Sequence, residues 1–293
     1  MDQQKNQPCT LTVPAYAKLN LTLDILGKRS DGYHEMKMVM QTISLHDDVT
    51  VTLGGERGIT CRVAGAALPC DERNLAVKAA KVFCGELRLP EAGIHIELTK
   101  RIPSEAGMAG GSADAAAVLR ALRALCTPEV SDQRLEKIGA AIGSDVPFCI
   151  RGGTQLAGGR GEVLTILEPA PKLYAAVCKP DFPISTPALF VRVDGVTLTG
   201  RPDSTAMIRA IADHDVPALC AQVGNVFEQA LDGAQRACIE EIKRALLRCG
   251  ANAAAMTGSG SAVFGLFRDE ETCRTACESI QSECVQVFCT KFV

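Results

Sequence analysis

The chain has 293 residues, of which 47% are hydrophobic and 4% aromatic, with a formal net charge of −3 at pH 7 and no tryptophan. This length predicts one large or two medium globular domains. The charge gives no electrostatic footprint for nucleic acid, and there is no basic run suited to an anionic membrane surface. The polar N-terminus and the absence of an apolar run of about 20 residues argue against export or a membrane span, so we expect a cytoplasmic protein.

Apolar periodicity in the first half of the chain predicts strands mixed with helices. Residues 15–26 alternate, with apolar side chains from Ala17 to Ile25 on one face and polar ones from Lys18 to Asp24 on the other, which predicts a half-buried strand. A turn over 27–34 follows. The remaining predictions are extended segments at 35–45, 48–53, 59–64 and 93–102, and helices at 74–87, from Ser112 to about Cys126, and at 131–143.

The second half follows the same mixed pattern. Residues 144–150 lead into a glycine-rich hairpin at 151–167, and the segment "EPAPK" at 168–172 is a candidate linker. Because strands and helices do not alternate strictly, an α+β fold is favoured over a doubly wound sheet, with domains at 1–168 and 169–293. Beyond the linker we expect a strand at 173–180, a further element from 185, helices within 203–249, a strand–turn–strand at 251–267, a helix at 269–284 and a strand at 285–293.

The chain contains fourteen cysteines. None forms a Cys-x-x-Cys pair or a Cys/His cluster with zinc-finger spacing, which disfavours a redox or metal protein that uses them. Cys273 and Cys277 lie four residues apart on a predicted helix, where they could together hold a metal. We favour the simpler interpretation, small buried residues in a reducing compartment.

The stretch "RIPSEAGMAGGSADAAAVLRAL" places glycines directly before a strong helix. Gly107, Gly110 and Gly111 can adopt positive φ and let a ligand approach the backbone. Ser112 is the expected N-cap, with Asp114 in the first turn. Free N–H groups and the helix dipole would favour an anion, so the loop is predicted to hold phosphate. It is neither a Walker A loop nor a Rossmann motif, and a tight strand–helix crossing that needs small residues is the alternative.

The same stretch resembles the Pro-x-x-x-Gly-Leu-Gly-Gly-Ser-Ser-x-Ala-Ala motif of the GHMP kinases, with mild departures at Met108, Ala109 and Ala113. "AKLNLTLDILGKRSDGYHEM", "IGSDVPFCIRGG" and "MTGSGSAVFGLF" resemble motifs of one branch, the 4-diphosphocytidyl-2-C-methyl-D-erythritol kinases. The four motifs occur in family order between residues 15 and 267. This resemblance implies an N-terminal ATP-binding domain like ribosomal protein S5 domain 2 and a C-terminal α/β substrate domain, with ATP and substrate meeting between them.

The resemblance implies an activity as well. It implies a kinase that phosphorylates the 2-hydroxyl of a cytidine diphosphate ester of methylerythritol in the non-mevalonate isoprenoid pathway. It implies ATP and Mg²⁺ as cofactors, a small-molecule substrate, and a monomer or weak homodimer. Another small-molecule GHMP kinase, of the homoserine or mevalonate type, is an alternative that the Asp-Gly-Tyr-His segment disfavours. A catalytically silent nucleotide-binding protein is a second, which retention of Lys18 and Asp145 disfavours.

Lys18 and Asp145 are the candidate catalytic residues. Taken alone, Lys18 is a lysine on the polar face of a strand, and Asp145 before Val146-Pro147 is a helix N-cap. The resemblance implies that the lysine lies at the acceptor hydroxyl and transferring phosphate, and that the aspartate accepts the substrate proton.

The resemblance also implies roles for binding residues. Tyr33 would stack on cytosine, His34 would hydrogen-bond it, and Phe190 would cover its other side; without the resemblance, a turn tyrosine and a core phenylalanine are equally good interpretations. Ser112 is the only suggested contact for Mg²⁺. Further substrate contacts are expected at Asn20, Thr186, Gly258 and Ser259. Nucleotide contacts are expected at Asn74, Lys100, Pro103, Ser104, Glu105, Ala106, Gly107, Met108, Ala109, Gly110, Gly111, Ser112 and Ala113.

Overall fold

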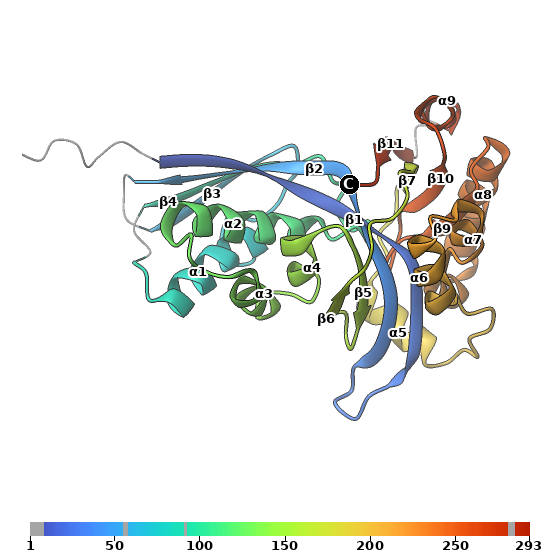
Figure 1. The fold of residues 1–293 in the computed structure, drawn as a ribbon, viewed down its shortest axis with the longest axis horizontal. Helices are drawn as coiled ribbons and strands as arrows, with labels where there is room; N and C mark the ends of the chain where they lie inside the picture. The colour runs from blue at the N-terminus through green and yellow to red at the C-terminus, as the bar shows by residue number, and fades with distance from the viewer. Residues whose placement is uncertain (1–8, 55–57, 91–92, 281–284) are drawn as a thin grey trace, which may run out of the picture. The chain divides into compact units, whose positions relative to one another are not determined.

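The structure is a computed structural model that describes residues 9–54, 58–90, 93–280 and 285–293 (Figure 1). The chain forms two compact units. One contains Met1–Ala17, His46–Ile102 and Ala109–Gly152; the other contains Lys18–Leu45, Pro103–Met108 and Gly153–Val293. The long strands β1 (Cys9–Lys28) and β2 (His34–Leu53) contribute residues to both units. The division predicted from the sequence, an N-terminal domain at 1–168 and a C-terminal domain at 169–293, stays a prediction.

The first unit is a sheet with helices on one of its faces (Figure 1). The end of β2 pairs antiparallel with β4 (Ile94–Thr99), and β3 (Ile59–Ala64) pairs parallel with β4. Alternating apolar residues such as Ile96 and Leu98 are buried against the helices, whose side chains Phe83 and Phe148 are fully buried. The helices of this unit are α1 (Leu75–Leu87), α2 (Gly110–Cys126), α3 (Asp132–Ala140) and α4 (Val146–Arg151).

The second unit contains a hairpin, a second sheet and several helices. Strands β5 (Thr154–Gly158) and β6 (Val163–Ile166) form the predicted hairpin, and β5 pairs with β2. The short β8 (Gly224–Asn225) runs parallel to β1. The second sheet has the order β11 (Val285–Lys291), β7 (Tyr174–Pro180), β10 (Val263–Phe267) and β9 (Ala253–Met256).

Helices α8 (Gly233–Arg248) and α9 (Glu270–Ile280) pack against the second sheet. The other helical segments of this unit are α5 (Thr186–Val193), α6 (Ser204–Ala212), α7 (Val216–Ala221) and the 3₁₀ helix η1 (Val226–Ala230). The α+β prediction is confirmed. The segments predicted at 35–45 and 48–53 are one continuous strand, β2, and of the helix predicted at 269–284 the residues 281–284 lie outside the described part.

The expectation of a half-exposed first strand is wrong, because the polar face of β1 is also buried. Lys18 is 3% exposed and Thr22 is fully buried. Thr22 shares a hydrogen bond of 3.0 Å with the Ser204 hydroxyl, and Arg201 donates to Asp24 at 2.6 Å. Buried polar groups require such partners, so this face carries a polar network rather than a solvated surface.

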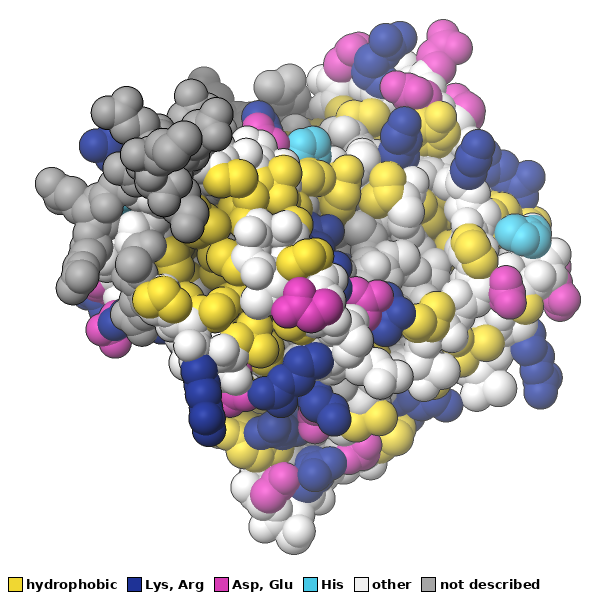
Figure 2. Space-filling view, turned by 60° about the vertical axis from the view of Figure 1, so that its left-hand side comes forward, with side chains coloured by type: hydrophobic (Ala, Val, Ile, Leu, Met, Phe, Trp, Pro, Cys, Tyr) yellow, Lys and Arg dark blue, Asp and Glu magenta, His cyan; other side chains and the backbone are white. Residues whose placement is uncertain are grey.

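Three further features concern membrane-spanning helices, surface charge and the cysteines. Within the described ranges, no helix combines the length and apolar character needed to cross a bilayer. Basic and acidic side chains are mixed with apolar ones on the face shown in Figure 2. The cysteines of the described part are free thiols. The expectation that they are buried is wrong for eight of them: Cys9, Cys70, Cys126 and Cys289 are exposed, and Cys61, Cys238, Cys249 and Cys277 are partly exposed.

Candidate active site

The glycine-rich loop contacts a second glycine-rich turn within the second unit. A Cβ on Gly107, whose φ is +73°, would lie 2.1 Å from the Thr257 carbonyl oxygen. A Cβ on Gly258 would lie 2.6 Å from the Gly107 carbonyl oxygen, and the Ala262 N–H donates to the Ala106 carbonyl at 3.3 Å. The two backbones are therefore too close for any side chain at these glycines. The alternative weighed from the sequence, a strand–helix crossing, is therefore not what requires Gly107: its close neighbour is the turn after β9.

Helix α2 begins earlier than the sequence pattern predicts. Its N-cap is Ala109, with φ +60°, and its first residue is Gly110, so the prediction that Ser112 caps the helix is wrong. The left-handed turn at Ala109 completes the loop and lets both following glycines enter the helix. The Ala113 N–H donates to the Ala109 carbonyl at 2.8 Å. The N–H groups of the three preceding helical residues have no carbonyl four residues back within the helix, which is the arrangement that attracts anions.

Lys100 and Asp114 belong to a buried ion cluster in the first unit. The Lys100 ammonium contacts Asp47 and Asp114, each at 2.5 Å, and the second Asp47 oxygen accepts the Ile102 N–H at 2.8 Å. Burial raises the pKa of Asp114 to about 7, opposed by Lys100 and aided by Asp47. Asp114 Oδ1 has no hydrogen-bond partner among the described residues. These contacts hold the beginning of α2 in place. A nucleotide contact by Lys100 stays a prediction.

Asn74 has a local structural role. Its side chain caps α1 by accepting the Ala76 N–H at 3.0 Å and donates to the Pro69 carbonyl at 2.9 Å. Both contacts hold the loop before α1 in place. The nucleotide contact expected for Asn74 also stays a prediction.

The Lys18 ammonium is directed at the glycine-rich loop. It donates to Asn20 Oδ1 at 2.5 Å and to the Gly107 carbonyl at 2.6 Å, while the Lys18 N–H donates to the Met108 carbonyl at 3.2 Å. Met108 itself is 1% exposed, so an apolar side chain fits where the family motif has leucine. A buried cation is costly unless it is hydrogen-bonded. These hydrogen bonds hold the Lys18 ammonium beside the loop.

Asp145 occupies the N-cap position of α4, as one of its two interpretations predicted. Its side chain makes no capping bond to the described α4 backbone, so the carboxylate, which is half-buried, does not serve as a cap. The preceding turn lies close to the start of α2: a Cβ on Gly143 would stand 3.9 Å from the Ser112 hydroxyl. Ser112 and the turn that carries Asp145 are therefore neighbours within the first unit.

His34 and Phe190 meet in the second unit. Their rings stack with centroids 4.7 Å apart and an interplanar angle of 19°. His34 Nε2 lies 2.6 Å from Asp194 Oδ1, and Lys28 contacts the other Asp194 oxygen at 2.6 Å. Hydrogen bonds from Lys28 and His34 hold the pKa of Asp194 below its usual range. Sequence reasoning missed Asp194, which lies 160 residues from His34 in the chain.

Tyr33 lies in the turn between β1 and β2. Its side chain is 55% exposed, and the Arg160 guanidinium lies 4.8 Å from its ring centroid. The Tyr33 N–H donates to Asp31, a bond that lowers the pKa of that carboxyl and fixes the turn. Stacking of a base between Tyr33 and Phe190 stays a prediction.

The turn after β9 is held by residues that sequence reasoning missed. Asn225 donates from its buried amide to the Met256 carbonyl at 2.7 Å and to the Gly258 carbonyl at 2.8 Å. Thr257 accepts the Asn20 N–H at 3.0 Å. Of the predicted residues, Thr186 and Ser259 come together, with hydroxyls 2.6 Å apart. No sequence motif marks Asn225, whereas the polar pattern of β1 did mark Asn20.

Comparison with known proteins identifies the family of this chain. Models of the GHMP kinases N terminal domain and GHMP kinases C terminal match residues 74–153 and 207–286. A Clostridium tetani protein named 4-diphosphocytidyl-2-C-methyl-D-erythritol kinase is 40% identical over 97% of this chain and 100% of its own length. A crystal structure of 4-(cytidine 5'-diphospho)-2C-methyl-D-erythritol kinase has a TM-score of 0.82 at 31% identity, covering 96% of this chain and 99% of that one. A homoserine kinase from Cytophaga hutchinsonii, at 18% identity and a TM-score of 0.73, covers 100% of this chain and 96% of its own and shows the fold alone.

The fold and the glycine-rich loop thus define a GHMP kinase, a phosphotransferase with an alcohol acceptor. Within these enzymes the chain belongs to the family of 4-diphosphocytidyl-2-C-methyl-D-erythritol kinases.

Proposed function

We propose that the chain transfers the γ-phosphoryl group of ATP to the 2-hydroxyl of 4-diphosphocytidyl-2-C-methyl-D-erythritol, the reaction expected from its sequence motifs. The names of its full-length relatives support this acceptor. Its place would be the cytoplasm, as a monomer or weak homodimer, in the non-mevalonate route to isoprenoid precursors. The likeness to homoserine kinase carries no information on the acceptor, because identity there is only 18%.

The buried Lys18 ammonium is the observation that supports phosphoryl transfer most strongly. Phosphoryl transfer depends on positioning and on neutralising negative charge, with little covalent work by the protein. An ammonium held by the Gly107 carbonyl and Asn20 is fixed at the loop before substrate binds. In our proposal it stabilises the charge that develops on the transferring phosphoryl group, and fixed groups of this kind need no reorganisation during the reaction.

Asp145 takes the proton in the proposed reaction. The substrate O–H bond breaks as the proton passes to the Asp145 carboxylate, the oxygen forms a bond to the γ-phosphorus, and the bond from that phosphorus to the bridging oxygen breaks to release ADP. The carboxylate is half-buried and is not engaged in capping α4, which leaves its oxygens available as acceptors. A positioned general base of this kind contributes about 10²–10⁴-fold to the rate.

The start of α2 is the proposed cradle for the ATP phosphates. Gly110 and Gly111 open the helix, Gly111 is exposed, and a Cβ there would meet only Leu75 at 3.5 Å. A ligand can therefore reach these N–H groups closely. Mg²⁺ fits the same place, because the Ser112 hydroxyl is a hard oxygen donor beside the Gly143 turn. When bound, Mg²⁺ would neutralise phosphate charge; Ser112 is the residue that would hold it.

The contact between His34 and Asp194 supports recognition of cytosine. Asp194 Oδ1, which can only accept, lies 2.6 Å from Nε2, so Nε2 is the donor of this hydrogen bond, and in the tautomer with a single proton Nδ1 is an acceptor. An acceptor can bind the exocyclic amino group of cytosine. Uracil carries a carbonyl oxygen at the same position, which has no proton to donate to this acceptor. Sites built to pair a substrate group in this way reject analogues that lack it.

An acceptor panel tests the proposal. ADP release is measured with the cytidine substrate, its uridine analogue, methylerythritol without the nucleotide, mevalonate and homoserine. The cytidine ester should react at least about 100-fold more efficiently than any other acceptor. Equal turnover of mevalonate or homoserine would place the chain in another branch of the GHMP kinases.

A further inference from the structure

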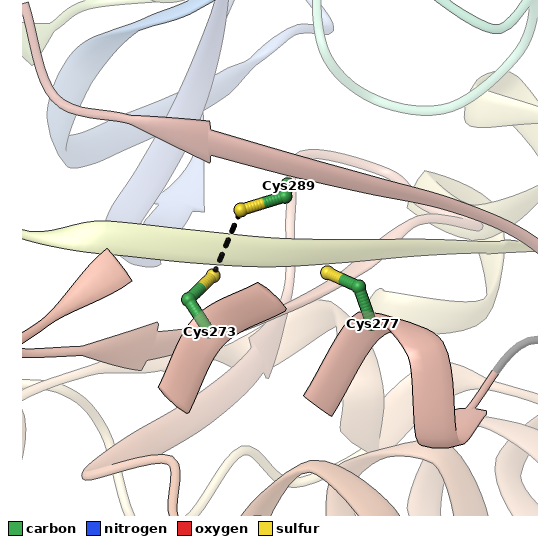
Figure 3. A group of neighbouring side chains, drawn as sticks. All are labelled: Cys273, Cys277 and Cys289. Carbon is green, nitrogen blue, oxygen red and sulfur yellow. Dashed lines mark hydrogen bonds between the residues drawn. The ribbon is translucent and has the colours of Figure 1, made fainter. Parts of the chain in front are cut away.

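Three thiols converge in the second unit, outside every residue assigned to phosphoryl transfer. Cys273 and Cys277 lie one turn apart on α9, and Cys289 lies on β11. Figure 3 shows the three side chains pointing toward one another, and its dashed line marks the hydrogen bond between Cys289 on the strand and Cys273 on the helix. Their Sγ atoms all lie within 4.8 Å of one another, and the Cys273–Cys289 separation is 3.5 Å.

These separations match the spacing of thiolates around one metal ion. With metal–sulfur bonds of about 2.3 Å, tetrahedral geometry places sulfur atoms about 3.8 Å apart. One observed separation is 3.5 Å and the others are at most 4.8 Å, which is compatible with this value. A disulfide would join only two of the three sulfurs and would not explain why the third lies beside them.

Burial and charge around the cluster also suit a cation. Cys273 is fully buried, Cys277 is half-buried and Cys289 is exposed, so an ion can enter from the Cys289 side. Glu270 and Glu278 stand on α9, the helix that carries Cys273 and Cys277. Their negative charge favours a bound cation.

We propose that Cys273, Cys277 and Cys289 bind one soft, thiophilic metal ion of the Zn²⁺ or Cu⁺ class and thereby tie α9 to β11. Thiolate ligands select such ions over Mg²⁺ or Ca²⁺. A solvent molecule completes the coordination on the exposed side. Because the three ligands come together only in the folded chain, binding stabilises the native state by mass action.

The test uses the full chain, reduced and freed of metal. Zn²⁺ and, without oxygen, Cu⁺ are titrated in competition with a chromophoric chelator, and Co²⁺ serves as a spectroscopic probe of thiolate ligation. The wild type should bind one equivalent, show a thiolate-to-Co²⁺ charge-transfer band and gain thermal stability. Cys277→Ser and Cys289→Ser, which avoid the fully buried position, should bind roughly 100-fold more weakly or worse. Cys126→Ser, an exposed cysteine outside the cluster, is the matched control and should behave as wild type.

Kinase activity separates this proposal from the proposed function, because Cys289→Ser should keep wild-type turnover. Zn²⁺ and Cu⁺ affinities in the wild type decide which ion the site prefers. The proposal is wrong if the two cluster variants bind either metal as tightly as the control, or if no thiolate-to-Co²⁺ band appears in the wild type. It is also wrong if Mg²⁺ gives the same cysteine-dependent stabilisation, or if the reduced protein binds neither ion.

Discussion

Two glycines of one loop should respond in opposite ways to the same substitution. In Gly107→Ala the new Cβ would lie 2.1 Å from the Thr257 carbonyl oxygen, at a φ of +73°. The left-handed backbone costs alanine about 1–2 kcal/mol. Relieving the clash requires one backbone to move, at an overpacking cost of about 1–3 kcal/mol. The expected destabilisation is therefore about 3 kcal/mol.

Gly111→Ala is the matched substitution in the same loop. Its Cβ meets only Leu75 at 3.5 Å, and its position inside α2 favours alanine by about 0.5–1 kcal/mol. The protein should fold as well as wild type or better. The added methyl group would obstruct the approach of phosphate to the helix start, so the KM for ATP should rise about tenfold, equivalent to about 1.4 kcal/mol. Gly110 is a poorer probe, because a Cβ there would stand 3.2 Å from Ile102.

Thermal unfolding and ATP kinetics measure both effects. An unfolding entropy of about 2 cal/mol/K per residue converts 3 kcal/mol into a Tm lowered by about 5 °C for Gly107→Ala. A wild-type Tm for Gly107→Ala would refute the reasoning about the crossing of the two loops. A wild-type KM for ATP in a stably folded Gly111→Ala would refute the phosphate cradle.

Three further substitutions test other parts of the account. Asp145→Asn should lower kcat by about 10²–10⁴-fold and leave ATP binding intact, as measured by steady-state kinetics and calorimetry; near-full turnover would remove Asp145 as the base. Asp194→Asn should raise the KM for the cytidine substrate and weaken the preference over the uridine analogue, because the amide no longer fixes the His34 tautomer; an unchanged preference contradicts that role. Asp114, with a pKa raised to about 7, keeps its proton in the native state at pH values where the unfolded chain has lost it. The native state therefore binds more protons between about pH 4 and 7, and the free energy of unfolding should fall as pH rises through that window, by at most about 1.4 kcal/mol per pH unit. Urea unfolding between pH 5 and 8 should show this slope in wild type and a flatter one in Asp114→Asn, and equal slopes would contradict it.

The local pattern of β1 predicted a strand but not its surroundings. Alternation gives the period of the side chains, and nothing in it says whether the polar face meets water or other protein groups. The partners of Thr22 and Asp24, Ser204 and Arg201, lie more than 170 residues away in the chain. Full burial of that face is therefore a tertiary property that no local signal carried.

The start of α2 illustrates a second limit. A serine before a helix-forming run is the usual N-cap, and glycine is rarely expected inside a helix. Here the left-handed turn at Ala109 ends the loop three residues earlier, so the glycines become the first helical turn. The loop motif still marked the right segment, because spacing of glycines and small residues is a local property of the chain.

The residues around His34 show what only the fold could reveal. The resemblance pointed to Tyr33, His34 and Phe190, but the carboxylate of Asp194 reaches His34 from the end of α5. Asn225 likewise holds the turn at Gly258 through two hydrogen bonds from a distant segment. Such supporting contacts depend on tertiary geometry and have no sequence signature.

The decisive experiment transfers phosphate from γ-labelled ATP to the cytidine substrate and analyses the product by phosphorus NMR. We expect the label in a monophosphate ester on the 2-hydroxyl of the methylerythritol moiety, and Lys18→Met should slow this transfer by about 10²–10³-fold. Label released only as inorganic phosphate, label on another hydroxyl, or wild-type transfer by Lys18→Met would overturn the proposed function.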